Sequence, residues 1–445
     1  MTEFWIKAGQ LLLSLSILVT LHELGHFIPA RLFGTRVKKF YLFFDFLFPL
    51  PNVMNFSLFK IKRGETEYGI GWFPMGGYVQ IDGMVDESMD TEALKQEPKP
   101  WEFRSKPAWQ RLIIMVGGVV VNLILGFLIY SMVLFSWGEE KLPIANMSYG
   151  VTVDSSMAVY GFQNGDKILE VGDAKYFSQI GMEIMVNETR NIKIERDGAV
   201  QEIMLPEEAN LELVDKGTKR LFAIRFPFAI DTVMPDGNAL KAGLLRDDVI
   251  VSVSGSPTPD AATGIMAIRS HKGKTIDLVV VRNGAEMKLN AEVSEEGQIG
   301  FRVKPMQEFL ETETYTYGFF ESIPAGFKKT GEKLGGYISS MKLVFTKEGA
   351  SQIGGFGAIG GMFSPTWDWH SFWSMTAFLS LILAFMNILP IPALDGGHVI
   401  FLLYEIVTGR KPGDKFMEYT QTVGMVLLLA LLVFANGNDI IRLFK

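Results

Sequence analysis

Apolar residues gather in four long runs, two near the start of the chain and two near its end. The length of each run is near the roughly 20 residues that a helix needs to cross the hydrocarbon core of a bilayer. The segment between the second and third runs has instead the mixed polar and apolar pattern of a water-exposed protein. The pattern therefore predicts four transmembrane helices, at residues 4–30, 109–137, 372–403 and 422–434.

The central segment, residues 140–305, alternates short apolar strands with turns rich in Gly, Asn and Asp. Two stretches within it, 161–172 and 242–255, share a pattern in which a Gly and an Asp precede a short apolar strand that ends at a Gly. An Arg-Asx-Gly turn between two further strands follows each stretch. This self-similarity predicts a duplicated small domain of about 80 residues. We expect domains at 1–137, 138–226, 227–310 and 311–445.

A separate group of strand signals lies between the first two apolar runs. Residues 57–62 and 67–73 flank a turn at Gly64, and residues 78–81 follow Gly76-Gly77. Short strand-forming runs separated by such turns predict a hairpin or a small sheet. Its aromatic side chains indicate a position close to the membrane.

An amphipathic stretch precedes the third apolar run. Residues 319–347 place Leu334, Ile338 and Met341 at helical spacing, with lysines at polar positions. The pattern predicts a helix lying at the membrane surface, and a core helix of a soluble domain is the alternative. The glycine-rich run 354–361 that follows predicts a flexible turn into the third apolar run.

Composition restricts the chemistry that the chain can carry out. There is no cysteine, which excludes disulfides, cysteine-ligated metals and thiol nucleophiles. Any metal must therefore be held by His, Asp or Glu, and the chain has only five His. The net charge of −7 argues against general binding of nucleic acid.

Basic residues that flank the apolar runs predict the orientation of the chain, because cytoplasmic loops carry an excess of Lys and Arg. With four spans, three basic groups fall on one side, which should be cytoplasmic. Both termini and the central segment should then face outward, although Arg442 and Lys445 compete with this assignment. The three groups are Arg31, Arg36, Lys38 and Lys39, then Arg104, Lys106 and Arg111, then Arg410, Lys411 and Lys415.

The first apolar run contains the sequence His22-Glu23-Leu24-Gly25-His26. Positions four apart share one face of a helix, so both imidazoles can bind one ion. Glu23 projects about 100° around the helix from His22, where it can act on water beside the ion without ligating. Hydrolysis at a zinc ion needs this division of roles, in which the imidazoles hold the ion and the carboxylate takes a proton from water. A chance match or a structural ion pair is the alternative, but polar groups are costly within an apolar span, which favours a functional role.

Two imidazoles do not complete a zinc site, which needs a third protein ligand. Asp395 is an acidic residue in the otherwise apolar third run, and we predict that it is this ligand, with a loop-capping role as the alternative. Pro390 and Pro392 remove backbone donors and should open the helix locally. The freed carbonyls and Asn387 could then hold a substrate backbone. His398 either supports the site or lies at the membrane interface.

The motif His22 to His26 and the motif Asn387 to Gly397 together closely resemble the site-2 protease family of intramembrane zinc metalloproteases. The central segment resembles tandem PDZ domains and is similar to the RseP-type bacterial branch of that family. Gly117 to Asn122 in the second run and Phe73 to Val79 before it are similar to that branch as well. The chain departs from the family at Gly117-Gly118, where Gly-Pro is frequent. It also lacks a clear carboxylate-binding loop in the first PDZ-like copy.

The resemblance implies roles for individual residues. His22, His26 and Asp395 match the zinc ligands, and Glu23 matches the catalytic base. Asn387 matches the residue that binds the main chain of the substrate near the scissile bond. A membrane-embedded β-loop is expected to clamp the substrate as an added strand. The residues of this loop are Phe73, Gly76, Gly77, Tyr78 and Val79, and the supporting residues are Asn122 and His398.

The expected fold is an α-helical membrane protein with about four transmembrane helices, a membrane-associated β-hairpin or sheet and two inserted PDZ-like α+β domains. By resemblance, it is a monomeric, multi-pass protein of the inner membrane that cleaves single-span membrane proteins, such as an anti-sigma factor or a signal-peptide remnant. Periplasmic PDZ-like domains would exclude substrates with bulky outer domains, and the active site would face the cytoplasm.

Two other functions fit parts of the sequence. A membrane-anchored PDZ scaffold with a structural or inactive zinc site is one, although Glu23 would have no purpose there. A metal transporter is the other, and the single compact group of ligands argues against it.

Overall fold

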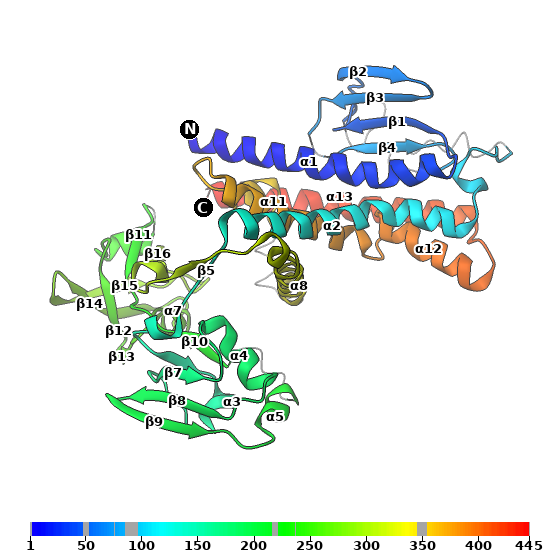
Figure 1. Cartoon of the computed structure of the whole chain (residues 1–445). Coiled ribbons are helices and arrows are strands. Elements are labelled where there is room, and N and C mark those ends of the chain that lie inside the picture. The colour runs from blue at the N-terminus through cyan, green and yellow to red at the C-terminus, as the bar shows by residue number, and fades with distance from the viewer. Residues whose placement is uncertain are drawn as a thin grey trace. The chain divides into compact units, whose positions relative to one another are not determined.

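The computed structural model describes residues 2–47, 53–74, 76–84, 97–215, 221–235, 237–344 and 354–444. The chain divides into two compact units (Figure 1). The first is formed by Met1–Gly138 together with Thr316–Lys445, and the second by Glu139–Tyr315.

The first unit is built mainly from helices, and four of the described helices are long and apolar enough to cross a membrane. This confirms the prediction of four spanning helices, although their bounds differ from the predicted ones. The structure places them at Thr2–Leu32, Ala108–Trp137, Trp369–Ile388 and Lys415–Ile441. The helices are α1 (Thr2–Leu32), α2 (Ala108–Trp137), α8 (Phe319–Val344), α10 (Phe356–Gly361), α11 (Trp369–Ile388), α12 (Asp395–Thr408) and α13 (Asp414–Phe444).

Helix α2 packs closely against two neighbours through glycines. A Cβ atom on Gly25 of α1 would collide with the carbonyl oxygen of Gly117 of α2, and a Cβ on Gly117 would collide with that of Gly25. Further along α2, a Cβ on Gly126 would meet the Leu381 side chain of α11 at 2.7 Å. Without a hydrophobic driving force between helices in lipid, such small residues allow close packing of the backbones. Helix α2 thus occupies the centre of the unit, between α1 and α11.

The third apolar run is not the continuous span 372–403 that we expected. Helix α11 ends at Ile388 and α12 begins at Asp395, with an irregular connection between them. Pro390 and Pro392 account for the break, because proline lacks an N–H and disfavours helical geometry in the residue before it. Arg111 of α2 pairs with Glu405 of α12 at 2.5 Å, which fixes the second half of the run against α2.

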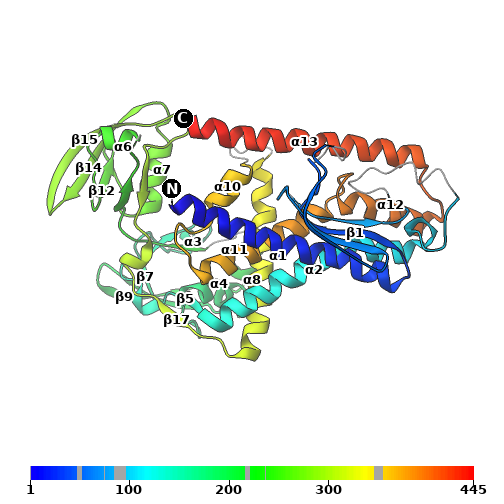
Figure 2. The ribbon, with the colours of Figure 1, turned by 90° about the horizontal axis from the view of Figure 1, so that it is seen from above.

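The glycine-rich run 354–361 contains a short helix rather than the flexible turn that we expected. Helix α10 lies between α1 and α13 (Figure 2). Asp439 of α13 caps its first turn, since Oδ2 accepts hydrogen bonds from the backbone N–H of Gly355 at 2.9 Å and of Ala358 at 3.0 Å. The carboxylate meets helix N–H groups that have no partner within the helix, and this stabilises a turn of intrinsically weak helix formers.

The predicted amphipathic helix is present as α8, and residues 345–347 of that prediction lie outside the described residues. It crosses α2 where a Cβ on Gly326 would collide with Ser131. Aromatic contacts extend the packing, with ring centroids of Phe135 and Phe319 5.8 Å apart.

The predicted hairpin belongs to a four-stranded sheet with the order β2-β3-β1-β4. The sequence pattern does not predict strand β1, because Lys38 and Lys39 hide its alternation and look like a basic flank of the first span. It pairs in parallel with β3 and antiparallel with β4, which leaves β4 as an edge strand beside α1. Gly77 allows this approach, because a Cβ there would meet Val19 of α1 at 2.7 Å. The strands are β1 (Val37–Leu42), β2 (Ser57–Arg63), β3 (Thr66–Gly71) and β4 (Tyr78–Ile81).

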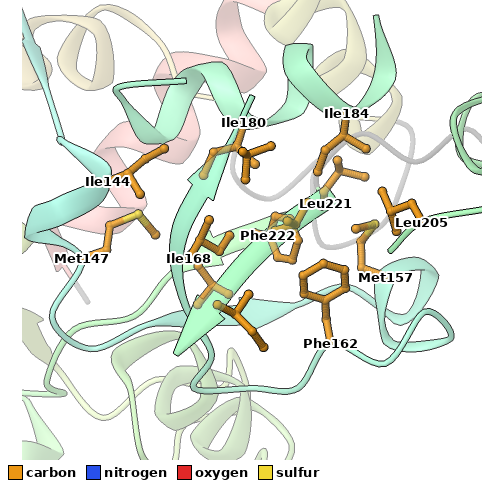
Figure 3. Packing of buried hydrophobic residues seen from close by; sticks show 14 of the residues in the cluster. Ile144, Met147, Met157, Phe162, Ile168, Ile180, Ile184, Leu205, Leu221 and Phe222 are labelled. Atoms are coloured by element: carbon orange, nitrogen blue, oxygen red, sulfur yellow. The ribbon is translucent and has the colours of Figure 1, made fainter. Parts of the chain in front are cut away.

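The second unit contains two hydrophobic cores, one for each half. Figure 3 shows the first core, where Ile168 of β7, Ile180 of α4 and Phe222 of β10 meet. The strands are β5 (Glu139–Lys141), β6 (Val151–Val153), β7 (Lys167–Val171), β8 (Asn191–Arg196), β9 (Ala199–Met204), β10 (Phe222–Ile224), β11 (Ile230–Val233), β12 (Val249–Val253), β13 (Ser256–Pro257), β14 (Thr275–Arg282), β15 (Ala285–Glu292), β16 (Phe301–Val303) and β17 (Glu313–Tyr315). The helices are α3 (Ser155–Ala158), α4 (Phe177–Met185), α5 (Ala209–Asp215), α6 (Asn238–Lys241) and α7 (Ala261–Arg269).

The same buried ion pair occurs in both halves of the second unit. Arg196 Nε donates to Asp166 Oδ1 at 2.7 Å, and Arg282 Nε donates to Asp248 Oδ1 at 2.7 Å. Each carboxylate also accepts a backbone N–H from the residue three positions before it, at 2.8 Å and 2.9 Å. The two pairs occupy matching places in the two similar sequence stretches, which supports an internal duplication.

The crossing of α1 and α2 can be tested with two glycine substitutions in α1. We expect Gly25→Ala to lower the Tm of the detergent-solubilised protein, because overpacking a tight contact costs about 1–3 kcal/mol. Gly9→Ala is the matched control, since a Cβ there meets Trp367 only at 4.0 Å. The control should be neutral or slightly stabilising, because alanine is the better helix former. Equal Tm values for the two variants would contradict the close crossing.

Candidate metal centre and active site

A cavity of about 120 Å³ lies within the first unit, on the side of α1 that faces the broken third run. Its walls come mainly from α1, α2, β4, the end of α11, the connection 389–394, α12 and α13. His22, Glu23 and His26 reach it from α1, and Asp395 reaches it from the first turn of α12. The structure therefore brings together the residues that the sequence places nearly 370 positions apart.

Three ligand-type atoms in this cavity form a nearly equilateral triangle. His22 Nε2 and His26 Nε2 lie 3.2 Å apart. Asp395 Oδ2 lies 3.4 Å from His22 Nε2 and 3.3 Å from His26 Nε2. Ligand atoms about 2.0 Å from a tetrahedral zinc ion stand roughly 3.3 Å apart, so the three separations fit one face of such a site.

The buried carboxylate also fits a metal centre. Asp395 Oδ2 is buried and accepts no hydrogen bond from the part of the chain that the structure describes. A buried charged oxygen that accepts no hydrogen bond is costly, whereas a cation would compensate its charge. His22, His26 and Asp395 are the described residues that group as a potential metal site.

The other ring nitrogens of the two imidazoles face α2. His26 Nδ1 lies 2.8 Å from the carbonyl oxygen of Ile114, which can only accept a hydrogen bond. The proton of His26 is therefore on Nδ1, and Nε2 presents its lone pair to the cavity. His22 Nδ1 lies 3.2 Å from Asn122 Nδ2, so this side chain also reaches the ring nitrogen that faces away from the cavity. Metal-ligating imidazoles are usually oriented by a hydrogen bond at the second nitrogen, as His26 is here. For His22 the same arrangement requires the Asn122 amide to turn and present its oxygen.

Glycines of α2 provide the space for the two rings. A Cβ on Gly118 would collide with His26 Nε2 and would lie 2.5 Å from His22 Cε1. Each residue of the Gly117-Gly118 pair therefore has its own contact on α1. Gly117 touches the backbone of α1, and Gly118 touches its imidazoles.

Two further predicted residues lie beside the triangle. Glu23 lines the same cavity from the next position on α1. Asn387, in the last turn of α11, brings its amide to 3.3 Å from His22 Nε2. A carboxylate and an amide are thus available next to the three ligand-type atoms.

The β-loop residues are divided between the cavity and its surroundings. Tyr78 and Val79 of β4 line the cavity, whereas Phe73, Gly76 and Gly77 are not among its described lining residues. The Tyr78 ring stacks on Tyr41 with centroids 5.4 Å apart, which fixes the edge strand. Burial raises the pKa of Tyr41 to about 12, so its hydroxyl remains a donor, to Glu67 Oε1 at 2.7 Å.

Helix α13 contributes residues that the sequence analysis missed. Gln421 and Met425 line the cavity, and Gln421 lies 2.8 Å from His398 Nε2. The available signal was a glutamine beside an apolar run, since polar side chains within membrane segments usually face the interior of a bundle. His398 itself lines the cavity and is not part of the triangle.

Comparison with known proteins assigns the chain to a family of metallopeptidases, in agreement with the geometry of the cavity. The model of peptidase family M50 matches residues 10–431. The chain is 26% identical to the regulator of sigma-E protease RseP of Escherichia coli over 100% of both chains. It is 27% identical to the metalloprotease MmpA of Caulobacter vibrioides, over 99% of this chain and 97% of that protein. It is also 26% identical to the protease RseP of Yersinia pestis, over 100% of both chains.

These matches span nearly the full length of the chain and include all the elements that form the cavity. Several other relatives carry zinc metalloprotease in their names. The chain belongs to peptidase family M50 and is a zinc-dependent metalloendopeptidase.

Proposed function

We propose that the chain cleaves peptide bonds within membrane-spanning segments, with zinc held by His22, His26 and Asp395 and with Glu23 as the catalytic base. The observation that carries this proposal is the triangle of ligand-type atoms, with separations of 3.2, 3.3 and 3.4 Å. Two of its three residues, His22 and His26, lie on α1, which is apolar enough to span a bilayer. Polar clusters in such helices are costly to bury and usually functional.

Zinc, when bound at these residues, lowers the pKa of water toward about 7 and polarises the carbonyl group of the substrate. Glu23 takes a proton from the attacking water and returns it to the amine that leaves. Its position beside the triangle, on the same helix as two of the ligands, suits this transfer. Asn387 donates its amide N–H to the substrate main chain near the scissile bond.

The edge strand β4 is the proposed binding surface for the substrate backbone. A transmembrane helix hides its carbonyl groups in internal hydrogen bonds, so a protease must unwind it and supply new partners. Strand β4 pairs only with β1 within the described sheet, and Tyr78 and Val79 face the cavity. A substrate strand added to β4 would therefore run past the metal site. Phe73, Gly76 and Gly77 would shape the preceding turn.

The proposed substrates are single-span proteins of the inner membrane. Relatives named as regulators of a sigma factor suggest an anti-sigma factor, and a signal-peptide remnant is the other class. We assign two PDZ-like domains to residues 138–226 and 227–310, outside the membrane, with the active site toward the cytoplasm. These domains would exclude a substrate until another protease has removed its bulky outer domain.

The catalytic role of Glu23 is tested with a purified transmembrane substrate in detergent. We expect Glu23→Gln to lower cleavage by about 10²- to 10⁴-fold, the usual contribution of general-base catalysis, while zinc content stays that of the wild type. A zinc chelator should abolish cleavage by the wild type. Equal cleavage by wild type and variant would remove Glu23 from the mechanism.

The role of Asn122 follows from the proton position on His22. If Nε2 binds zinc, Nδ1 carries the proton and needs an acceptor. Turning the Asn122 amide by 180° provides one, and it gives Oδ1 the partner that it otherwise lacks among the described residues. We expect Asn122→Leu to weaken zinc binding by about 10- to 100-fold. Asn122→Asp should retain most of the affinity, and Ser131→Ala on the same helix is the control. Unchanged affinity in Asn122→Leu would contradict this role.

The exclusion of untrimmed substrates is tested in cells by replacing residues 139–315 with a flexible linker. The wild type should cut only a substrate whose outer domain has been removed, and the shortened protein should cut trimmed and untrimmed forms alike. A shortened protein that cuts the trimmed form and still leaves the untrimmed form intact would disprove the filter.

A further inference from the structure

Gln421 of α13 connects two parts of the metal-site region. Its Oε1 accepts a hydrogen bond from the backbone N–H of Ala393 at 3.0 Å. Its Nε2 lies 2.8 Å from His398 Nε2. Ala393 lies two residues before Asp395, and His398 lies one helical turn after it. A single side chain from another helix thus holds both sides of the residue proposed as the third zinc ligand.

The chemistry of these contacts fixes the state of both side chains. A backbone N–H can only donate, so the atom of Gln421 that meets Ala393 must be its oxygen. The nitrogen of the amide then donates to His398 Nε2, which must be an unprotonated acceptor. The lone pair of His398 Nε2 is therefore used in this hydrogen bond. His398 serves as an anchor for Gln421 rather than as a fourth ligand through that atom.

The connection that Gln421 holds is tightly folded and strained. Ala393 has a φ of +75°, a left-handed conformation that residues other than glycine rarely adopt. Such a conformation persists only where its surroundings enforce it, and such sites concentrate near functional residues. At the start of α12, a Cβ on Gly396 would collide with the carbonyl oxygen of Leu389. The position of Asp395 therefore depends on contacts that keep this connection folded.

A second contact from α13 acts on the same connection. A Cβ on Gly424 would collide with the carbonyl oxygen of Pro392. Gly424 lies three residues after Gln421, so the two positions share one face of α13. The face of α13 defined by Gln421 and Gly424 therefore contacts two consecutive residues, Pro392 and Ala393.

We propose that Gln421 is a positioning residue for zinc, and that α13, through Gln421 and Gly424, sets the place of Asp395 in the metal site. This inference rests on the proposed zinc ligands. It assigns to the last spanning helix a function in metal binding, although none of its described residues belongs to the proposed ligand set. Displacing α13 from the connection should loosen Asp395 while leaving His22 and His26 in place on α1.

The first test measures zinc affinity of the full-length protein in detergent, by competition with a chromophoric chelator. We expect Gln421→Leu to weaken zinc binding by about 10- to 100-fold, as removal of a residue that supports a metal ligand typically does. At limiting zinc its kcat should fall and should recover when zinc is added, with KM for the substrate unchanged. Gln10→Leu is the matched control, because it removes a comparable contact, from Gln10 Nε2 to the carbonyl of Ser364 at 2.8 Å, away from the cavity.

The second test uses two glycines of α13 and leaves Gln421 intact. Gly424→Ala should push α13 away from Pro392 and should therefore weaken zinc binding, as Gln421→Leu does. Gly437→Ala should keep wild-type affinity, since a Cβ there meets nothing within 4 Å. This pair keeps the inference testable if Gln421→Leu fails to fold.

The outcomes separate this inference from the proposed site. His22→Ala should abolish tight zinc binding, and if it does not, both the proposed site and the role of Gln421 are wrong. If His22→Ala abolishes binding while Gln421→Leu and Gly424→Ala both bind zinc like the wild type, only the positioning role is wrong.

Discussion

The backbone contact between Gly25 of α1 and Gly117 of α2 is the constraint on which the metal centre depends. It brings the two helices so close that the adjacent Gly118 must also lack a side chain to leave room for the imidazoles. The same proximity lets the Ile114 carbonyl and the Asn122 amide reach the ring nitrogens that face away from the cavity. One close crossing thus provides space and orientation for the two proposed ligands on α1, and it fixes the proton position of His26.

The position of the proposed third ligand has a different origin. The two imidazoles are fixed by a regular helix, whereas Asp395 follows an irregular connection in which Ala393 is held in a left-handed conformation. Irregular backbone at membrane depth is tolerated where it is buried in protein or lines a cavity, and here it does line one. We infer that α1 and α2 fix the positions of His22 and His26, whereas the position of Asp395 depends on α13.

The pattern of apolar and polar residues along the chain predicts those parts of the molecule that depend on local sequence. The spacing of His22 and His26 places both on one helical face, and the acidic Asp395 in an apolar run is conspicuous without any structure. Strand β1 escaped prediction because Lys38 and Lys39 interrupt its apolar pattern, and its partners in the sheet are distant in sequence. Helix α10 escaped because its stability comes from Asp439, about 80 residues away, and not from its glycines. The role of Gln421 depends on tertiary contacts of the same kind.

Asp395 is proposed to bind zinc together with His22 and His26, and the rest of the mechanism depends on this ligand set. X-ray absorption at the zinc edge of an Asp395→Cys variant tests this directly, because the chain has no other cysteine. We expect a zinc–sulfur distance of about 2.3 Å in the variant, and only nitrogen and oxygen ligands in the wild type. A variant that still binds zinc through nitrogen and oxygen alone would show that residue 395 is not a ligand.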